Sequence, residues 1–116
     1  MLVEDEADLI LYLKESLEAY GYKTLVAHNG KKALEVFRQE IDKIDMIISD
    51  VVMPEMGGLE LNLMINSLKS DVKFLLISAY TNRLEPGIPF LQKPFSIEEL
   101  MATVRHILDE TYVFEN

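Results

Sequence analysis

A continuous apolar run that ends in one aspartate constrains the fold of this chain more than any other feature. Met46-Ile47-Ile48 lead through Ser49 into Asp50, and the segment Val51-Val52-Met53-Pro54-Glu55-Met56-Gly57-Gly58 follows. An uninterrupted apolar run bounded by turn residues is typical of a strand buried on both faces, as in a parallel sheet. Pro54 cannot continue the ladder, and the two glycines permit a tight turn. The sequence therefore predicts a strand with Asp50 at its carboxyl end, where ligands bind in open α/β sheets.

Strands and helices alternate along the rest of the chain. Short apolar runs predict further strands at residues 1–3, 23–27, 73–77 and 90–92. Helical spacing predicts helices at 7–20, 31–40 and 59–70, and a last helix after the capping box of Ser96 and Glu99. Such alternation predicts a parallel sheet with right-handed crossovers and helices on both faces.

The connection between Ser78 and Phe90 is unusual, because it is short and contains Pro86, Gly87 and Pro89. A parallel crossover with its own helix needs at least roughly 10–12 residues. We therefore expect a loop or a single turn there rather than a full helix.

Length and charge narrow the classes of function. A chain of 116 residues fits one domain, residues 1–116. Its net charge of −9 argues against binding to nucleic acid or to an anionic membrane. Cysteine is absent, which excludes disulfides and thiolate metal sites. No stretch approaches a transmembrane span and the start lacks the features of a signal peptide, so we expect a cytoplasmic protein.

Polar side chains stand where four of the expected strands end. Glu4 and Asp5 follow the first strand, Asp50 ends the third, and Ser78 and Lys93 follow the fourth and fifth. If the first and third strands are neighbours, three carboxylates converge, repel and raise one another's pKa. A hard divalent cation such as Mg²⁺ relieves this repulsion.

A lysine and a hydroxyl beside such a cluster suit a phosphoryl group, since the ammonium and the hydroxyl both interact with its oxygens. A carboxylate that faces the phosphoryl group is then a candidate nucleophile, which would form an aspartyl phosphate. Each feature alone is better explained as a solvated helix cap or the start of a loop. Their combination at four strand ends favours the phosphoryl site.

Together these residues resemble the receiver domain of two-component response regulators over essentially the full chain. The matching motifs are Glu4-Asp5, Asp50 within Ser-Asp-Val-Val-Met-Pro-Glu-Met-Gly-Gly, Ser78-Ala79, and Phe90 with Lys93-Pro94-Phe95. The segment that ends in Gln-Lys-Pro-Phe is most similar to receivers attached to hybrid sensor histidine kinases.

The resemblance implies an α/β, flavodoxin-like, doubly wound five-stranded parallel sheet of order 2-1-3-4-5. It implies that Asp50 accepts a phosphoryl group from a histidine kinase or a phosphotransfer domain. Asp5, Asp50, the Val52 backbone carbonyl and, through water, Glu4 would hold Mg²⁺. Ser78 and Lys93 would contact the phosphoryl oxygens.

The resemblance further implies that Ser78 and Phe90 form the switch, in which the Ser78 hydroxyl moves to the phosphoryl group and the Phe90 ring turns inward. It also implies that the Lys93–Pro94 bond is cis. Such a domain is a regulatory phosphoacceptor rather than an enzyme. It does not itself bind nucleic acid or membrane, and it is compatible with a weak homodimer or with being part of a hybrid kinase.

Two departures from the family pattern stand out. The usual Met-Pro-x-Met-Asp-Gly reads Met-Pro-Glu-Met-Gly-Gly here, which removes a surface aspartate. The short link between Ala79 and Pro89 implies that the helix between the fourth and fifth strands is shortened or missing, so binding of partners through the usual surface is in doubt.

Other functions fit the residues less well. A phosphohydrolase of the haloacid-dehalogenase type needs a second acid two residues past its nucleophile, and Val52 occupies that position. A binding-only pseudo-receiver would not need every chemically required residue, yet all are present. A nucleotide-binding domain is disfavoured because no glycine-rich phosphate loop follows a strand.

Overall fold

The computed structural model describes residues 1–79 and 87–114. At its centre is a five-stranded parallel sheet of order β2-β1-β3-β4-β5. Its strands are β1 (Leu2–Val3), β2 (Val26–Ala27), β3 (Met46–Asp50), β4 (Lys73–Ser78) and β5 (Phe90–Gln92). The strand order and the doubly wound fold expected from the resemblance are confirmed.

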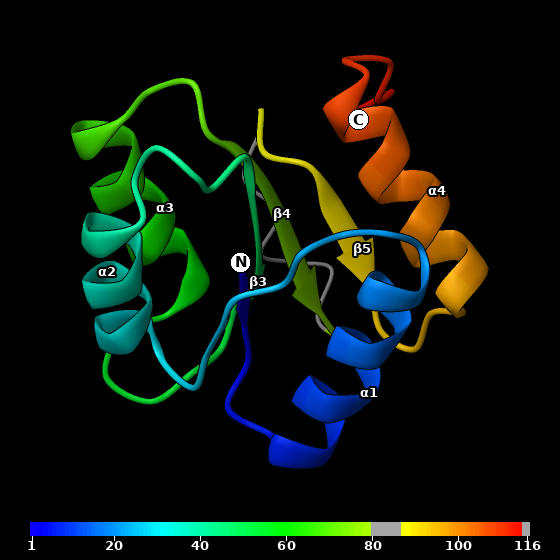
Figure 1. Ribbon diagram of the computed structural model, residues 1–116, viewed down its shortest axis with the longest axis horizontal. Coiled ribbons are helices and arrows are strands. Elements are labelled where there is room, and N and C mark those ends of the chain that lie inside the picture. Colours follow the sequence, from blue (N-terminus) through cyan, green and yellow to red (C-terminus); the bar gives the residue numbers. More distant parts are fainter. Residues whose placement is uncertain (80–86, 115–116) are drawn as a thin grey trace.

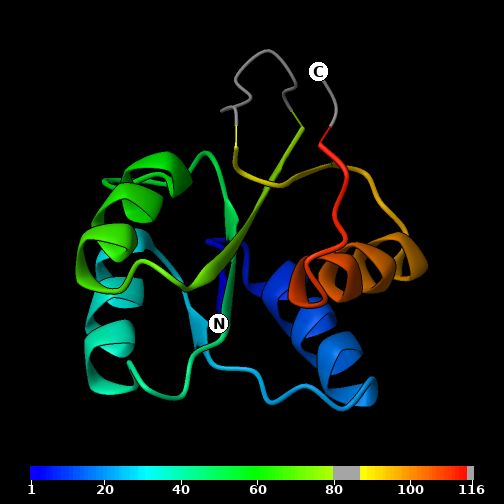
Figure 2. The ribbon, with the colours of Figure 1, turned by 90° about the horizontal axis from the view of Figure 1, so that it is seen from above.

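Four helices cover the two faces of the sheet in the described part of the chain. They are α1 (Ala7–Ala19), α2 (Gly30–Gln39), α3 (Gly58–Leu68) and α4 (Ile97–Leu108). Helices α2 and α3 lie on one face, and α1 and α4 lie on the other (Figures 1 and 2). Strand β3 is therefore covered on both sides, and all five of its residues are buried.

Side chains of β3 alternate between two hydrophobic clusters, one on each face of the sheet. Ile47 belongs to the cluster under α2 and α3, whereas Ile48 belongs to the cluster under α1 and α4. The period of two residues along a strand produces this alternation. Fully buried members of the first cluster include Val3, Phe37, Leu61, Ile65 and Leu76, and those of the second include Leu2, Leu13, Leu75 and Leu100.

Capping residues define where two helices begin. Asn29 accepts a hydrogen bond from the Lys32 backbone N–H at the start of α2. Ser96 and Glu99 form the expected capping box of α4, each side chain bonding the other's backbone N–H at 3.0 and 3.1 Å.

Several boundaries differ from the sequence expectation. Strand β2 has only its last two expected residues, Val26 and Ala27. The sheet pairs β2 with β1, which is itself only two residues long. Leu25 still accepts a hydrogen bond from the Leu2 N–H, but the strand itself is assigned only to the two residues that pair with β1. Helix α3 begins at Gly58 and ends two residues earlier than expected.

The short link before β5 is only partly described. Residues 80–86 lie outside the described residues. The expectation of a loop or a single turn in place of a full helix therefore stays a prediction for that segment. Within residues 79 and 87–89, no helix is formed. Among the described helices, none has the length and apolar composition needed to cross a membrane.

Candidate functional site

The parallel register brings the ends of four strands to one edge of the sheet. Val3 lies opposite Ser49, Asp50 opposite Ile77, and Ser78 opposite Gln92. Glu4 and Asp5 therefore come directly beside Asp50, and Lys93 comes beside Ser78. The convergence that the sequence predicted is what the structure shows.

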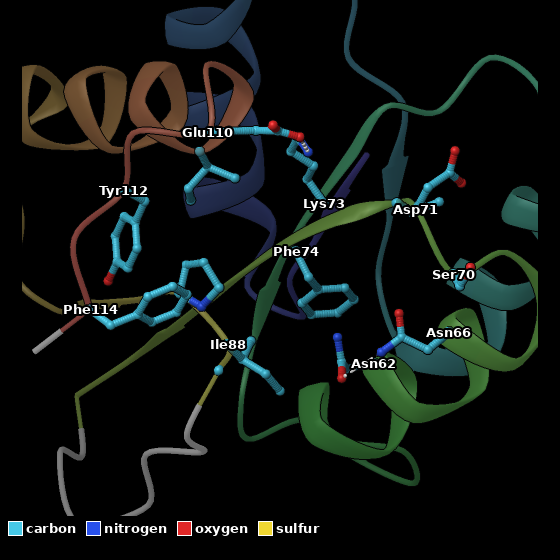
Figure 3. A pocket seen from close by; sticks show the side chains of 14 residues that line it. Asn62, Asn66, Ser70, Asp71, Lys73, Phe74, Ile88, Glu110, Tyr112 and Phe114 are labelled. Carbon is cyan, nitrogen blue, oxygen red and sulfur yellow. Dashed lines mark hydrogen bonds and ion pairs between the residues drawn. The ribbon is translucent and has the colours of Figure 1, made fainter. Parts of the chain in front are cut away.

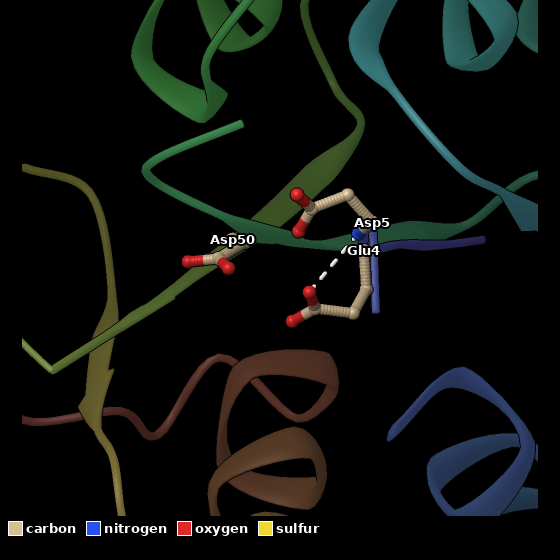
Figure 4. A group of neighbouring side chains, drawn as sticks. All are labelled: Glu4, Asp5 and Asp50. Atoms are coloured by element: carbon tan, nitrogen blue, oxygen red, sulfur yellow. Dashed lines mark hydrogen bonds between the residues drawn. The ribbon is translucent and has the colours of Figure 1, made fainter. Parts of the chain in front are cut away.

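Three carboxylates form a compact acidic cluster at this edge (Figure 4). Glu4, Asp5 and Asp50 each place one carboxylate oxygen within 4.8 Å of an oxygen of the other two. Glu4 and Asp50 are buried, with 1% and 8% of their surface exposed, while Asp5 is exposed to solvent. Carboxylate oxygens that reach solvent on the side of Asp5 suit Mg²⁺, because this ion takes few protein ligands and keeps several waters.

Glu4 is held by the backbone at the start of α1. Its Oε2 accepts hydrogen bonds from the backbone N–H groups of Asp5 and Glu6, at 3.0 and 3.1 Å. Burial raises the pKa of the Glu4 carboxyl above its usual value, although the hydrogen bond from Lys93 opposes that shift. Glu4 is thus a buried carboxylate whose negative charge the surroundings only partly compensate.

Lys93 bridges two of the three carboxylates. Its Nζ lies 3.0 Å from Oε1 of Glu4 and 3.2 Å from Oδ2 of Asp50. Burial alone would lower the pKa of Lys93, but the hydrogen bond to Glu4 and the charge of Asp50 outweigh burial and raise it. Lys93 is therefore a protonated cation that faces Asp50, and its peptide bond to Pro94 is cis, as the resemblance implied.

The remaining expected site residues lie around this centre. Ser78 is buried at the end of β4, and its carbonyl accepts a hydrogen bond of 2.9 Å from the Lys93 backbone N–H. Val52 lies two residues beyond Asp50 with 62% of its surface exposed. Phe90 is the first residue of β5, half-buried, and packs against the cluster under α2 and α3.

The two glycines after β3 are needed for a reason that the sequence did not reveal. Neither adopts a positive φ, whereas Glu55 does, at 67°. A Cβ on Gly57 would meet the Val51 carbonyl oxygen, and one on Gly58 would meet that of Asp50. The glycines therefore let the start of α3 pack directly on the backbone that carries Asp50.

Sequence reasoning missed one contact near the site. Tyr112, which follows α4, bonds the backbone of Phe90 on β5. A single tyrosine in the short segment after the last helix carries no periodic signal, so only the three-dimensional arrangement could reveal this contact.

Comparison with known proteins agrees with this geometry. A family model described as the response regulator receiver domain matches residues 1–105. Sensor kinase CckA of Brucella abortus (strain 2308) is 34% identical over 117 residues, which cover 95% of this chain and 12% of the kinase. The uncharacterized transcriptional regulatory protein YrkP of Bacillus subtilis (strain 168) is 36% identical over 111 residues, which cover 90% of this chain and 46% of YrkP.

Solved structures give the same result. The receiver domain of the hybrid histidine kinase CckA superimposes with a TM-score of 0.83 at 34% identity, covering 92% of this chain and 95% of that one. Response regulator TrrA of Thermotoga maritima, in complex with Mg²⁺–BeF, gives a TM-score of 0.83 at 32% identity, covering 91% and 95%.

The chain spans at most about half the length of these curated relatives, so the similarity concerns one part of each. Within that part, the match extends over nearly all of this sequence and includes the edge of the sheet where Glu4, Asp5, Asp50 and Lys93 meet. The chain therefore belongs to the response regulator receiver domain family.

Proposed function

We propose that this domain is a phosphoacceptor switch in which Asp50 takes a phosphoryl group from the phosphohistidine of a histidine kinase or phosphotransfer domain. The observation that supports this most strongly is the position of Lys93, whose ammonium lies 3.2 Å from an Asp50 oxygen inside the acidic cluster. A carboxylate and a cation so close together provide a nucleophile and a charge that can receive phosphoryl oxygens.

The chemistry is the transfer of one phosphoryl group. An Asp50 oxygen attacks phosphorus, the bond from phosphorus to the histidine nitrogen breaks, and the electron pair of that bond returns to the imidazole. Lys93 then contacts an oxygen of the phosphoryl group instead of the free carboxylate, and the Ser78 hydroxyl donates to another. Hydrolysis of the acyl phosphate by water returns Asp50 to its carboxylate form.

A divalent cation fits the donor set of this site. Asp5 and Asp50 would bind it directly and Glu4 through water, with the Val52 carbonyl as a further ligand. Mg²⁺ bound there would neutralise charge on the cluster and on the incoming phosphoryl oxygens. TrrA, whose solved structure contains Mg²⁺–BeF, supports this proposal by similarity.

The partner that we propose is a histidine kinase or phosphotransfer domain in the cytoplasm. Similarity to the CckA receiver supports a domain that is part of a hybrid sensor kinase. A hydrolase acting on small phosphate esters is less well supported. Val52 is an exposed valine at the position where such an enzyme needs an acid.

The first prediction tests the acceptor. Incubation with acetyl phosphate and Mg²⁺ should add the mass of one phosphoryl group to the protein, as measured by intact mass spectrometry. Asp50→Asn should lose this gain entirely, because an amide is a poor nucleophile. Asp42→Asn, an exposed aspartate outside the cluster, is the matched control and should label like the parent. Undiminished labelling of Asp50→Asn would contradict the assignment.

A further inference from the structure

The segment after α4 turns back sharply and reaches β5. Asp109 ends the helix, and Glu110 has a left-handed backbone with φ of 61°. The Glu110 N–H bonds the Ile107 carbonyl and the Thr111 N–H bonds the His106 carbonyl, the two bonds of a Schellman motif. We call residues 110–114 the C-terminal strap.

The strap is held to the rest of the domain at several points. The Glu110 carboxylate lies 3.0 Å from Lys73 Nζ on β4, and the Thr111 hydroxyl lies 2.8 Å from His106 Nδ1. Tyr112 and Phe114 pack edge to face, with ring centroids 5.0 Å apart. In Figure 3 these two rings lie on one side of a cleft, with Phe74 and Asn62 on the other.

The Tyr112 side chain forms hydrogen bonds with the backbone of Phe90 on the outer edge of β5. The Tyr112 hydroxyl accepts a hydrogen bond from the Phe90 backbone N–H and donates one to the Phe90 carbonyl, both at 3.2 Å. Strand β5 is at the edge of the sheet, and residues on either side of Phe90 bond β4: the Pro89 carbonyl accepts from the Leu76 N–H, and the Lys93 N–H donates to the Ser78 carbonyl. The outward-facing N–H and C=O of Phe90 would otherwise have only solvent as partner.

The same short strand connects the strap to the acidic cluster. Lys93 directly follows β5, and its backbone N–H bonds the Ser78 carbonyl while its ammonium bonds Glu4 and Asp50. A phosphoryl group on Asp50 would change the oxygen that the Lys93 ammonium now contacts, so Lys93 would have to exchange one of its two partners. Phe90 lies three residues before Lys93 on the same short strand, so a shift of the backbone at Lys93 would also displace Phe90. The two bonds between Phe90 and the Tyr112 hydroxyl are long, at 3.2 Å, and therefore weak.

We propose that the C-terminal strap is a latch on β5 that is closed in the unphosphorylated domain and is released when Asp50 is phosphorylated. This inference rests on the proposed function. Because the strap binds one state of β5 better than the other, the coupling is reciprocal, and loosening the strap favours the phosphorylated state.

The test uses Tyr112→Phe, which removes the hydroxyl and keeps the ring. Tyr20→Phe, at an exposed tyrosine that caps the end of α1, is the control. Amide exchange of Phe90, followed by NMR, should be faster in Tyr112→Phe than in the parent or in Tyr20→Phe. In the parent, addition of Mg²⁺ and beryllofluoride should speed the exchange of Phe90 and of residues 110–114.

Affinity provides the second measurement. Titration with beryllofluoride in saturating Mg²⁺ should give a Kd about two- to fivefold lower for Tyr112→Phe than for the parent, the size expected from weakening one or two hydrogen bonds. An unchanged or higher Kd, or greater protection of Phe90 in the beryllofluoride complex, overturns the latch. Failure of the parent to bind beryllofluoride at all would instead overturn the proposed function, and the latch with it.

Discussion

At the scale of single residues, Glu4 shows how function and stability conflict in this site. Its side chain is almost fully buried, yet the cluster contains two further carboxylates and only one cation, Lys93, within bonding distance among the described residues. Burying an ionised group is costly unless it is well paired. The raised pKa of Glu4 reflects that cost, which the proposed metal site would explain.

The second prediction follows from that cost. Because the pKa of Glu4 is higher in the folded than in the unfolded chain, folding stability falls as pH rises from about 4.5 through the folded value. Glu4→Gln keeps an acceptor for the Asp5 and Glu6 N–H groups but has no charge. Because the raised pKa already includes the contact with Lys93, the metal-free form of this variant should be more stable than the parent at pH 7.5, where the parent carboxyl is above its unfolded-state pKa.

Urea unfolding at several pH values measures this difference. The gain should shrink as the pH is lowered toward 4.5, where the parent carboxyl also becomes neutral. Glu35→Gln, which changes an exposed glutamate on α2, is the control and should show no such dependence. A less stable Glu4→Gln at pH 7.5 would mean that its ion pair with Lys93 outweighs the cost of burial.

At the scale of elements, the sequence predicts type and order well because periodicity is a strong signal. Helical spacing predicts a buried stripe of Leu9, Ile10, Leu13 and Leu17 in the first helix; the last three are buried in α1 and Leu9 is half-buried. The β3 run is buried as expected. Boundaries depend on partners that lie far away in sequence, and β2 is short for that reason. The turn at Glu110 gave no signal, because glycine usually marks a left-handed helix end and glutamate stands there instead.

Glu110 therefore carries the third prediction. A residue other than glycine with positive φ costs about 1 kcal/mol or more, while an ion pair as exposed as Glu110 with Lys73 contributes about 0–1 kcal/mol. Glu110→Gly should leave the free energy of unfolding unchanged or raise it by about 0.5 kcal/mol. Lys73→Gln removes only the ion pair and should lower it slightly. A loss above 1 kcal/mol in Glu110→Gly, measured by urea unfolding, would show that the ion pair dominates the turn.

At the scale of the whole molecule, negative charge is the prominent property. Twenty acidic residues face eleven basic ones, a net charge of −9. Three of the acids meet at one edge of the sheet, and the parallel topology alone explains why residues so far apart in sequence do so. The sequence could predict that meeting because each acid follows a recognisable strand. It could not predict which carboxylate is buried, since burial depends on how α1 and β5 pack around the cluster.

This charge distribution leads to the last prediction. A cation that binds the folded domain and not the unfolded chain stabilises it by mass action, about 1.4 kcal/mol at a free concentration ten times its Kd. For a domain of this size, that corresponds to a rise in Tm of roughly 5 °C. Thermal unfolding in Mg²⁺ and in EDTA should show this difference at matched ionic strength, because salt alone also screens the net charge. Asp5→Asn should abolish the difference and Asp42→Asn should keep it. A rise in Tm that persists in Asp5→Asn would place the stabilising cation away from the cluster of Glu4, Asp5 and Asp50.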